Sequence, residues 1–147
     1  MAHFTRTILK TLFICFFLLP GINGCKDDYT SVVPYVYVNT SINPTNIIEL
    51  NIPGGSWYFP NMGFGGIILF RDLADTPTFF AFDAACTYEV SSMIRVVADG
   101  SGLATCPKCK SQFILFGGNG SPANGPAIEP LKQYRTSYSG SRISIRN

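Results

Sequence analysis

Residues 106–113 of this sequence read Cys106-Pro107-Lys108-Cys109-Lys110-Ser111-Gln112-Phe113, and a shorter segment upstream reads Cys86-Thr87-Tyr88. Glycine- and proline-rich segments follow at 117–122 and 125–127, and a later stretch reads Pro130-Leu131-Lys132-Gln133-Tyr134. Two cysteine segments, glycine turns and a short apolar segment, in this order, are the most specific pattern in the chain. The candidate chemistry therefore centres on Cys86, Cys106 and Cys109.

Around these segments, the chain from roughly residue 80 to residue 147 resembles the Rieske iron–sulfur domain. That family carries Cys-Thr-His in one loop and Cys-Pro-x-His-x-Ser in a second, followed by a glycine-rich turn, a Gly-Pro-Ala loop and a Pro-Leu-x-x-Tyr strand. The chain is also similar to small Rieske-like lipoproteins whose cluster ligands vary. The resemblance implies an all-β fold, a Rieske-like antiparallel β-sandwich or barrel whose two cysteine loops meet in a small tip subdomain at about residues 82–116.

The ligand positions depart from the family. The resemblance places Cys86 and Cys106 at the two cysteine positions, whereas Tyr88 and Cys109 stand where the two histidines belong. A Rieske centre holds one iron through two cysteines and the other through two histidines, so the resemblance implies an altered ligand set.

Neighbouring positions carry further differences. Ser91 and Lys108 occupy the places of two extra cysteines that some Rieske domains join in a disulfide, so that clamp is absent. Ser111 matches the serine that donates a hydrogen bond near the cluster, Lys110 replaces the usual glycine, and Phe113 stands where tyrosine is common.

Four chemical states of these loops stay open. A 2Fe–2S cluster would use Cys86, Cys106, Cys109 and Tyr88, although a phenol with a pKa of ~10 is a poor ligand near neutral pH. Zinc would use the three cysteines and lack a fourth protein ligand. Cys86 would form a disulfide with Cys106 or Cys109 in an oxidising compartment, or all three thiols would be free. We favour a site without cluster or metal, with the 2Fe–2S cluster second and zinc third.

Short strands and frequent turns extend through the rest of the chain. Pro34 suggests that the first of these runs is an edge strand. Apolar or alternating runs of strand type occupy residues 32–38, 47–52, 67–70, 79–82, 93–98, 112–116 and 142–145. Glycine, asparagine, proline and serine separate them, and no stretch repeats apolar residues at helical spacing. We expect a single Rieske-like domain over residues 32–147, with residues 63–66 forming a tight hairpin.

Composition excludes several functions. The chain has 147 residues, a formal net charge of +2 and 14% charged residues, which gives no support to nucleic-acid binding. Its one histidine is His3, so a chain cleaved after residue 24 has no histidine for a catalytic triad or a metal site.

The N-terminal residues resemble a bacterial lipoprotein signal peptide. Arg6 and Lys10 precede an unbroken apolar run at 12–19, which is too short to span a bilayer, since a spanning helix needs ~20 residues. Ile22-Asn23-Gly24-Cys25 resembles a lipobox. We expect residues 1–24 to be removed, Cys25 to be lipidated and residues 25–31 to form a polar tether.

The expected location is the outer membrane of a Gram-negative bacterium. Lys26-Asp27-Asp28, directly after the lipidated cysteine, looks like the signal that sends some lipoproteins to the cell surface, and the alternative is a solvated tether. The membrane is the one partner this implies, and no protein partner can be named.

The functional prediction follows from the altered ligands. We expect a membrane-anchored, non-redox binding or structural module, and the alternative is a 2Fe–2S electron-transfer protein using Cys86, Cys106 and Cys109. No nucleophile–base pair is recognisable, so no catalytic residue is assigned and we expect no enzyme. Asp83 and Glu89 are expected to be solvated, and Trp57 to serve packing rather than to bind sugars.

Overall fold

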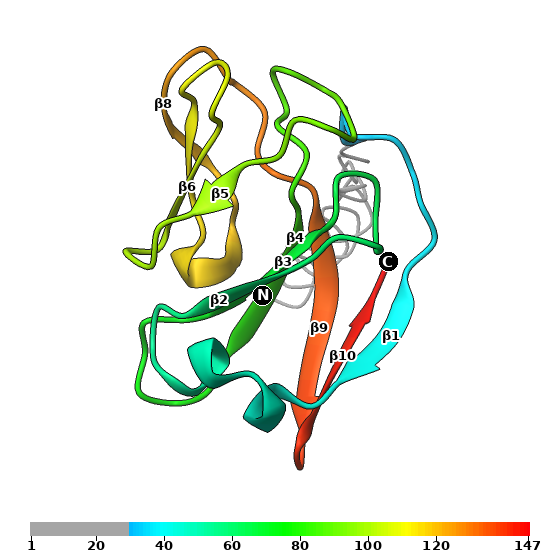
Figure 1. The fold of residues 1–147 in the computed structure, drawn as a ribbon, viewed down its shortest axis with the longest axis vertical. Helices are drawn as coiled ribbons and strands as arrows, with labels where there is room; N and C mark the ends of the chain where they lie inside the picture. The colour runs from blue at the N-terminus through cyan, green and yellow to red at the C-terminus, as the bar shows by residue number, and fades with distance from the viewer. Residues whose placement is uncertain (1–29) are drawn as a thin grey trace, which may run out of the picture.

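The computed structural model describes residues 30–147, which fold into two antiparallel sheets (Figure 1). The predicted signal peptide, Cys25 and Lys26-Asp27-Asp28 lie outside the described residues. The elements are β1 Asn39–Ile42, η1 Pro44–Asn46, η2 Ile48–Asn51, β2 Ser56–Phe59, β3 Ile67–Arg71, β4 Phe79–Asp83, β5 Val97–Ala98, β6 Leu103–Thr105, β7 Gln112–Ile114, η3 Phe116–Gly118, β8 Pro122–Asn124, β9 Gln133–Ser139 and β10 Arg142–Arg146. The six-stranded sheet has the order β1-β10-β9-β4-β3-β2, and the four-stranded sheet has the order β5-β6-β7-β8. This confirms the all-β prediction.

Strand β3 explains how the core is divided. Ile67 and Leu69 point into one apolar cluster, with Ile143 and Ile145 of β10. Ile68 and Phe70 point to the opposite face, into the cluster that the six-stranded sheet forms with the four-stranded sheet. A strand buried on both faces needs apolar residues at every position, which is why residues 67–70 form a continuous run instead of an alternating one.

The cysteine loops begin where the second cluster ends. Cys86 and Cys106 are themselves fully buried members of that cluster, beside residues such as Phe82 and Phe113. The site is therefore built on packed strands, and the apolar contacts fix its position.

Two predicted strands are wrong. Residues 32–38 do not pair as a strand, and the first strand is β1, immediately after them. Residues 47–52 form the 3₁₀ helix η2 instead, after η1. Pro44 starts η1 with a preset φ, and the Asn43 side chain caps it by accepting a hydrogen bond from the backbone N–H of Thr45 at 3.1 Å. These local signals outweigh the apolar alternation.

Other predictions differ in extent. Of residues 93–98 only β5 is a strand, and Arg95 adds an isolated bridge to Ala85. The glycine-rich residues 63–66 do lie in the loop of the β2–β3 hairpin, as expected. Trp57 lies on β2, at the edge of its sheet, and is 40% exposed, so it is not a core residue.

Candidate metal centre at the tip

The first loop leaves β4 and returns to β5. It is closed at its base by hydrogen bonds from the backbone N–H of Val96 to Ala84 O at 2.8 Å and from that of Cys86 to Ile94 O at 3.4 Å. Cys86 is thus at the start of a loop whose two ends are held together. These two hydrogen bonds hold the backbone on which the Cys86 sulfur is carried.

The second loop is a tight turn between β6 and β7. The backbone N–H of Cys106 donates to Ser111 O at 2.8 Å, and the backbone N–H of Lys110 donates to Cys106 O at 3.0 Å. Lys110 has a φ of 64°, in the left-handed region that favours glycine. The turn therefore keeps the conformation for which the Rieske pattern uses glycine, although the residue is lysine.

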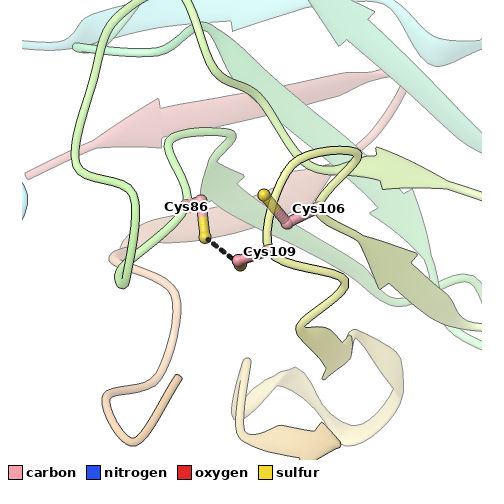
Figure 2. A group of neighbouring side chains, drawn as sticks. All are labelled: Cys86, Cys106 and Cys109. Atoms are coloured by element: carbon pink, nitrogen blue, oxygen red, sulfur yellow. Dashed lines mark hydrogen bonds between the residues drawn. The ribbon is translucent and has the colours of Figure 1, made fainter. Parts of the chain in front are cut away.

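The three candidate cysteines meet between these loops, as Figure 2 shows. Their sulfur atoms all lie within 4.8 Å of one another, and the Cys86 and Cys109 sulfurs are 3.6 Å apart. All three are free thiols, since a disulfide would need an S–S distance of ~2.05 Å. Cys86 and Cys106 are buried, and Cys109 is partly exposed.

Ser111 connects the second loop with a third. The Cys109 thiol donates to the Ser111 hydroxyl at 3.1 Å, and the same oxygen accepts from the backbone N–H of Ala127 at 3.0 Å. Gly125 must be glycine here, because a Cβ atom would lie 2.6 Å from the Ser111 Cα, and its φ is +88°. The Gly-Pro-Ala segment thus packs directly against the cysteine turn.

The thiols differ in acidity. Burial raises the pKa of Cys86 to about 12, against the opposing effect of backbone hydrogen bonds from Glu89 and Tyr88. Partial burial is also the largest influence on Cys109, but hydrogen bonds from Ser111, Cys106 and Cys86 outweigh it and hold the pKa of Cys109 below its ordinary value. Of these two thiols Cys109 is therefore the one that ionises more readily, and burial opposes the ionisation of Cys86.

Tyr88 does not share the environment of the cysteines. Its side chain is 57% exposed, and its backbone hydrogen bond to Cys86 is its visible contribution to the site. A salt bridge of 2.7 Å between Lys108 Nζ and Glu89 Oε2 joins the first two loops. Lys108 stands where the resemblance places one half of the missing disulfide, so an ion pair links the two loops that a disulfide links in some Rieske domains.

Asp83, expected to be solvated, is fully buried. Its Oδ1 accepts from the backbone N–H groups of Gly65 and Ala85 at 2.9 and 3.0 Å, and its Oδ2 accepts from that of Phe64 at 2.7 Å. Oδ2 also accepts from the Tyr134 hydroxyl at 2.8 Å. Burial, followed by the charge of Asp83, raises the pKa of Tyr134 well above its ordinary value.

Sequence reasoning missed this network. Asp83 stands next to an apolar strand and gives no signal of burial by itself. The tyrosine of the Pro-Leu-x-x-Tyr segment was the available clue, because a buried phenol needs a hydrogen-bond partner. The network fixes the backbone between β4 and Cys86, so Asp83 positions the first loop.

Solved structures with the same fold are known. The plasma membrane Rieske protein of the cyanobacterium Synechocystis superposes with a TM-score of 0.55 at 23% identity, covering 77% of this chain and all (100%) of that one. The ferredoxin of carbazole 1,9a-dioxygenase from Nocardioides aromaticivorans gives a TM-score of 0.51 at 18% identity, covering 76% of this chain and 98% of that one. A chain from a complex of oxygenase and ferredoxin in carbazole 1,9a-dioxygenase gives a TM-score of 0.51 at 17% identity, covering 77% of this chain and 94% of that one.

The chain therefore has a Rieske-like β fold with a three-cysteine tip. No protein-family model matches the sequence, and no curated protein is similar enough to count as a match. Over residues 30–147, no helix is both long and apolar enough to cross a bilayer.

The donor set decides which group the tip fits. Residues 30–147 contain no histidine, so the two-histidine iron of a Rieske centre has no counterpart among them. The Cys86 and Cys109 sulfurs are 3.6 Å apart, although the ligands at these two positions bind different irons in the Rieske pattern. The arrangement fits one ion touching all three sulfurs better than it fits a pair of irons.

Proposed function

We propose that this protein is a non-redox, metal-binding Rieske-like module in which Cys86, Cys106 and Cys109 bind one thiophilic ion, with zinc as the favoured metal. The observation that supports this is the spacing of the sulfurs. With Zn–S bonds of ~2.3 Å, two thiolates on a tetrahedral zinc lie about 3.8 Å apart. The Cys86–Cys109 pair, at 3.6 Å, is close to that edge, and the 4.8 Å limit for the trio leaves a contraction of at most about 1 Å for the third sulfur.

The ion would supply positive charge and hold the loops together, without changing oxidation state. The chain's own residues prepare the site: Cys109 provides a thiol that is more acidic than that of Cys86, and backbone N–H groups stabilise the sulfur of Cys86. Binding releases the thiol protons to solvent. Since Cys109 is partly exposed, the fourth position is left to solvent. Glu89, the carboxylate of the first loop, is paired with Lys108, and no enzymatic role is proposed.

Metal analysis tests the proposal. The full chain, purified anaerobically, should carry about one zinc per molecule. After chelation, titration with Co²⁺ should reach its endpoint at about one equivalent and give intense thiolate-to-cobalt absorption. Cys106→Ser should lose this absorption, whereas the same replacement at Cys25, outside the trio, should keep it. A preparation that binds no metal, with Cys86 joined to Cys109 in a disulfide, would contradict the proposal.

An electron-transfer protein with a 2Fe–2S cluster is the second candidate. It is favoured by the likeness to a Rieske protein and to a ferredoxin, and by the backbone hydrogen bonds to the Cys86 sulfur. In this case anaerobic preparations would contain iron and acid-labile sulfide in equal amounts and show an electron paramagnetic resonance signal on reduction. Three thiolates would place the potential below the Rieske range.

We also propose that lipid on Cys25 holds the domain at the outer membrane, because the Ile22-Asn23-Gly24-Cys25 pattern resembles a lipobox. Cys25→Ser should move the protein out of the membrane fraction and leave the leader uncleaved. Replacing Lys26, Asp27 and Asp28 with alanine should keep the lipid and reduce digestion by protease added to intact cells. Equal digestion of both forms would mean that the triplet is only a tether.

A further inference from the structure

The tip and the start of the described chain lie at the same end of the molecule. Figure 1 shows the blue start of the described chain beside the light-green first loop, and the turn between β9 and β10 at the opposite end. The contacts agree: Thr30 and Ser31 line one cavity with Pro130 and Leu131. The residue before them, Glu129, accepts a hydrogen bond from the Thr87 hydroxyl at 2.7 Å, next to Cys86.

Large apolar side chains are exposed at this end. Met93 of the first loop is 90% exposed, and Ile128 of the third loop is 87% exposed. The two loops are in contact through the hydrogen bond from the Thr87 hydroxyl to the Glu129 carbonyl oxygen, so Met93 and Ile128 both lie on loops at this end of the molecule. The exposed large apolar residues of the segments at this end, here together called the tip face, are Val32, Tyr35, Tyr88, Val90, Met93 and Ile128.

The tether limits how far this end can lie from the membrane. Four residues lie between Cys25 and Thr30, and the five Cα–Cα steps across them reach about 17 Å when the chain is fully extended. The β9–β10 turn is further away by the length of β9, which at seven residues is about 20 Å. Because the lipid sits at the end of this short tether, the tip face is the apolar surface nearest the bilayer.

We infer that the tip face docks on the lipid bilayer, so that the three-cysteine site is turned toward the membrane. The inference rests on the lipid anchor proposed above. Apolar and tyrosine side chains suit the boundary between headgroups and acyl chains, where such groups insert by ~5–10 Å. Lys110, exposed on the second loop, donates a hydrogen bond from its Nζ to Pro107 O at 2.7 Å, and its positive charge on that loop suits anionic headgroups.

Single-tryptophan variants test the orientation. The one native tryptophan, Trp57, is replaced by Phe, and a reporter is placed by Met93→Trp or Ile128→Trp. The matched control is Ile48→Trp, since Ile48 is 82% exposed but lies on η2, at the opposite end from the tip (Figure 1). The full chain, lipidated in a Gram-negative host, is reconstituted in vesicles of phosphatidylethanolamine and phosphatidylglycerol with or without bromine on the acyl chains.

Bromine should reduce the fluorescence of both tip reporters by about half, because a docked side chain reaches the acyl boundary, and should leave the reporter at position 48 unchanged. Equal insensitivity of all three reporters in protein that floats with the vesicles would overturn the docking and leave the anchor intact. Protein that fails to float would overturn the anchor and the docking together. Emission at position 93 that depends on protein concentration but not on bromine would show a second copy of the chain on the tip face, which also overturns the inference.

Discussion

Asp83→Asn removes one acceptor from the buried network and is the sharpest test of how the first loop is held. Asparagine can keep its oxygen toward Gly65 and Ala85, but its NH₂ group then faces the backbone N–H of Phe64. The Tyr134 hydroxyl can turn and accept instead of donating. A backbone donor loses its partner in either orientation of the amide: that of Phe64 in this one, and those of both Gly65 and Ala85 when the amide is flipped.

The size of the effect follows from that count. An orphaned buried donor costs about 1–3 kcal/mol, and the remaining bonds lose the strength that the carboxylate charge gave them. We expect the free energy of unfolding to fall by about 2–3 kcal/mol. With a urea m-value of about 1–3 kcal/mol per molar, the midpoint shifts down by roughly 1–2 M at unchanged m.

The assay is urea unfolding of the Cys25→Ser chain with a chelator present, so that metal binding does not contribute. The matched control is Asp99→Asn: the Asp99 Oδ1 accepts from the backbone and hydroxyl of Ser101 at 2.9 and 2.7 Å, but the pair is exposed. The control should change stability by less than about 0.5 kcal/mol. If Asp83→Asn changes it equally little, the buried network does not position the loop.

Three further outcomes are expected. Zinc at about a thousand times its dissociation constant should raise the free energy of unfolding by about 4 kcal/mol, and Cys106→Ser should abolish the effect in the same urea titration. Folding raises the pKa of Tyr134, so the stability that this group contributes is fully present below the unfolded pKa of ~10 and is lost as pH rises above it. Tyr134→Phe should therefore flatten the decline of the free energy of unfolding above pH ~10 by up to about 1.4 kcal/mol per pH unit. An unchanged slope would contradict the burial of this phenol. Lys110→Gly should stabilise the turn by about 0.5–1 kcal/mol, since the left-handed φ costs lysine more than it costs glycine; a loss of stability in thermal unfolding would show that the side chain itself is needed.

Much of the fold could be predicted from the order of the motifs. The apolar runs at 67–70 and 79–82 are strands β3 and β4, as expected. A strand that is buried on one or both faces shows this burial in its sequence as an alternating or continuous apolar run, so such strands can be predicted. The run at 47–52 has a similar pattern but follows Pro44 and its Asn43 cap, and such local turn chemistry is decided by a few hydrogen bonds that the pattern does not show.

The site was predictable in part. The meeting of Cys86 with Cys106 and Cys109 followed from the resemblance, and the structure places the three sulfurs together. The spacing of the sulfurs depends on backbone detail, and so does the burial of Asp83, whose four donors come from three separate segments of the chain. No local sequence signal encodes an acceptor whose donors are that far apart.

The 3.6 Å separation of the Cys86 and Cys109 sulfurs also allows disulfide formation to compete with metal binding while the protein matures. In the oxidising compartment proposed for it, a disulfide oxidant can remove two electrons and two protons from this pair and join the sulfurs. The acidic thiol of Cys109 is the one that would react first, and the bond would occupy two of the three donors. For the proposed metal site this means that the ion must bind before the oxidant reacts, so the fraction of molecules that carry an ion would depend on relative rates during export as well as on affinity.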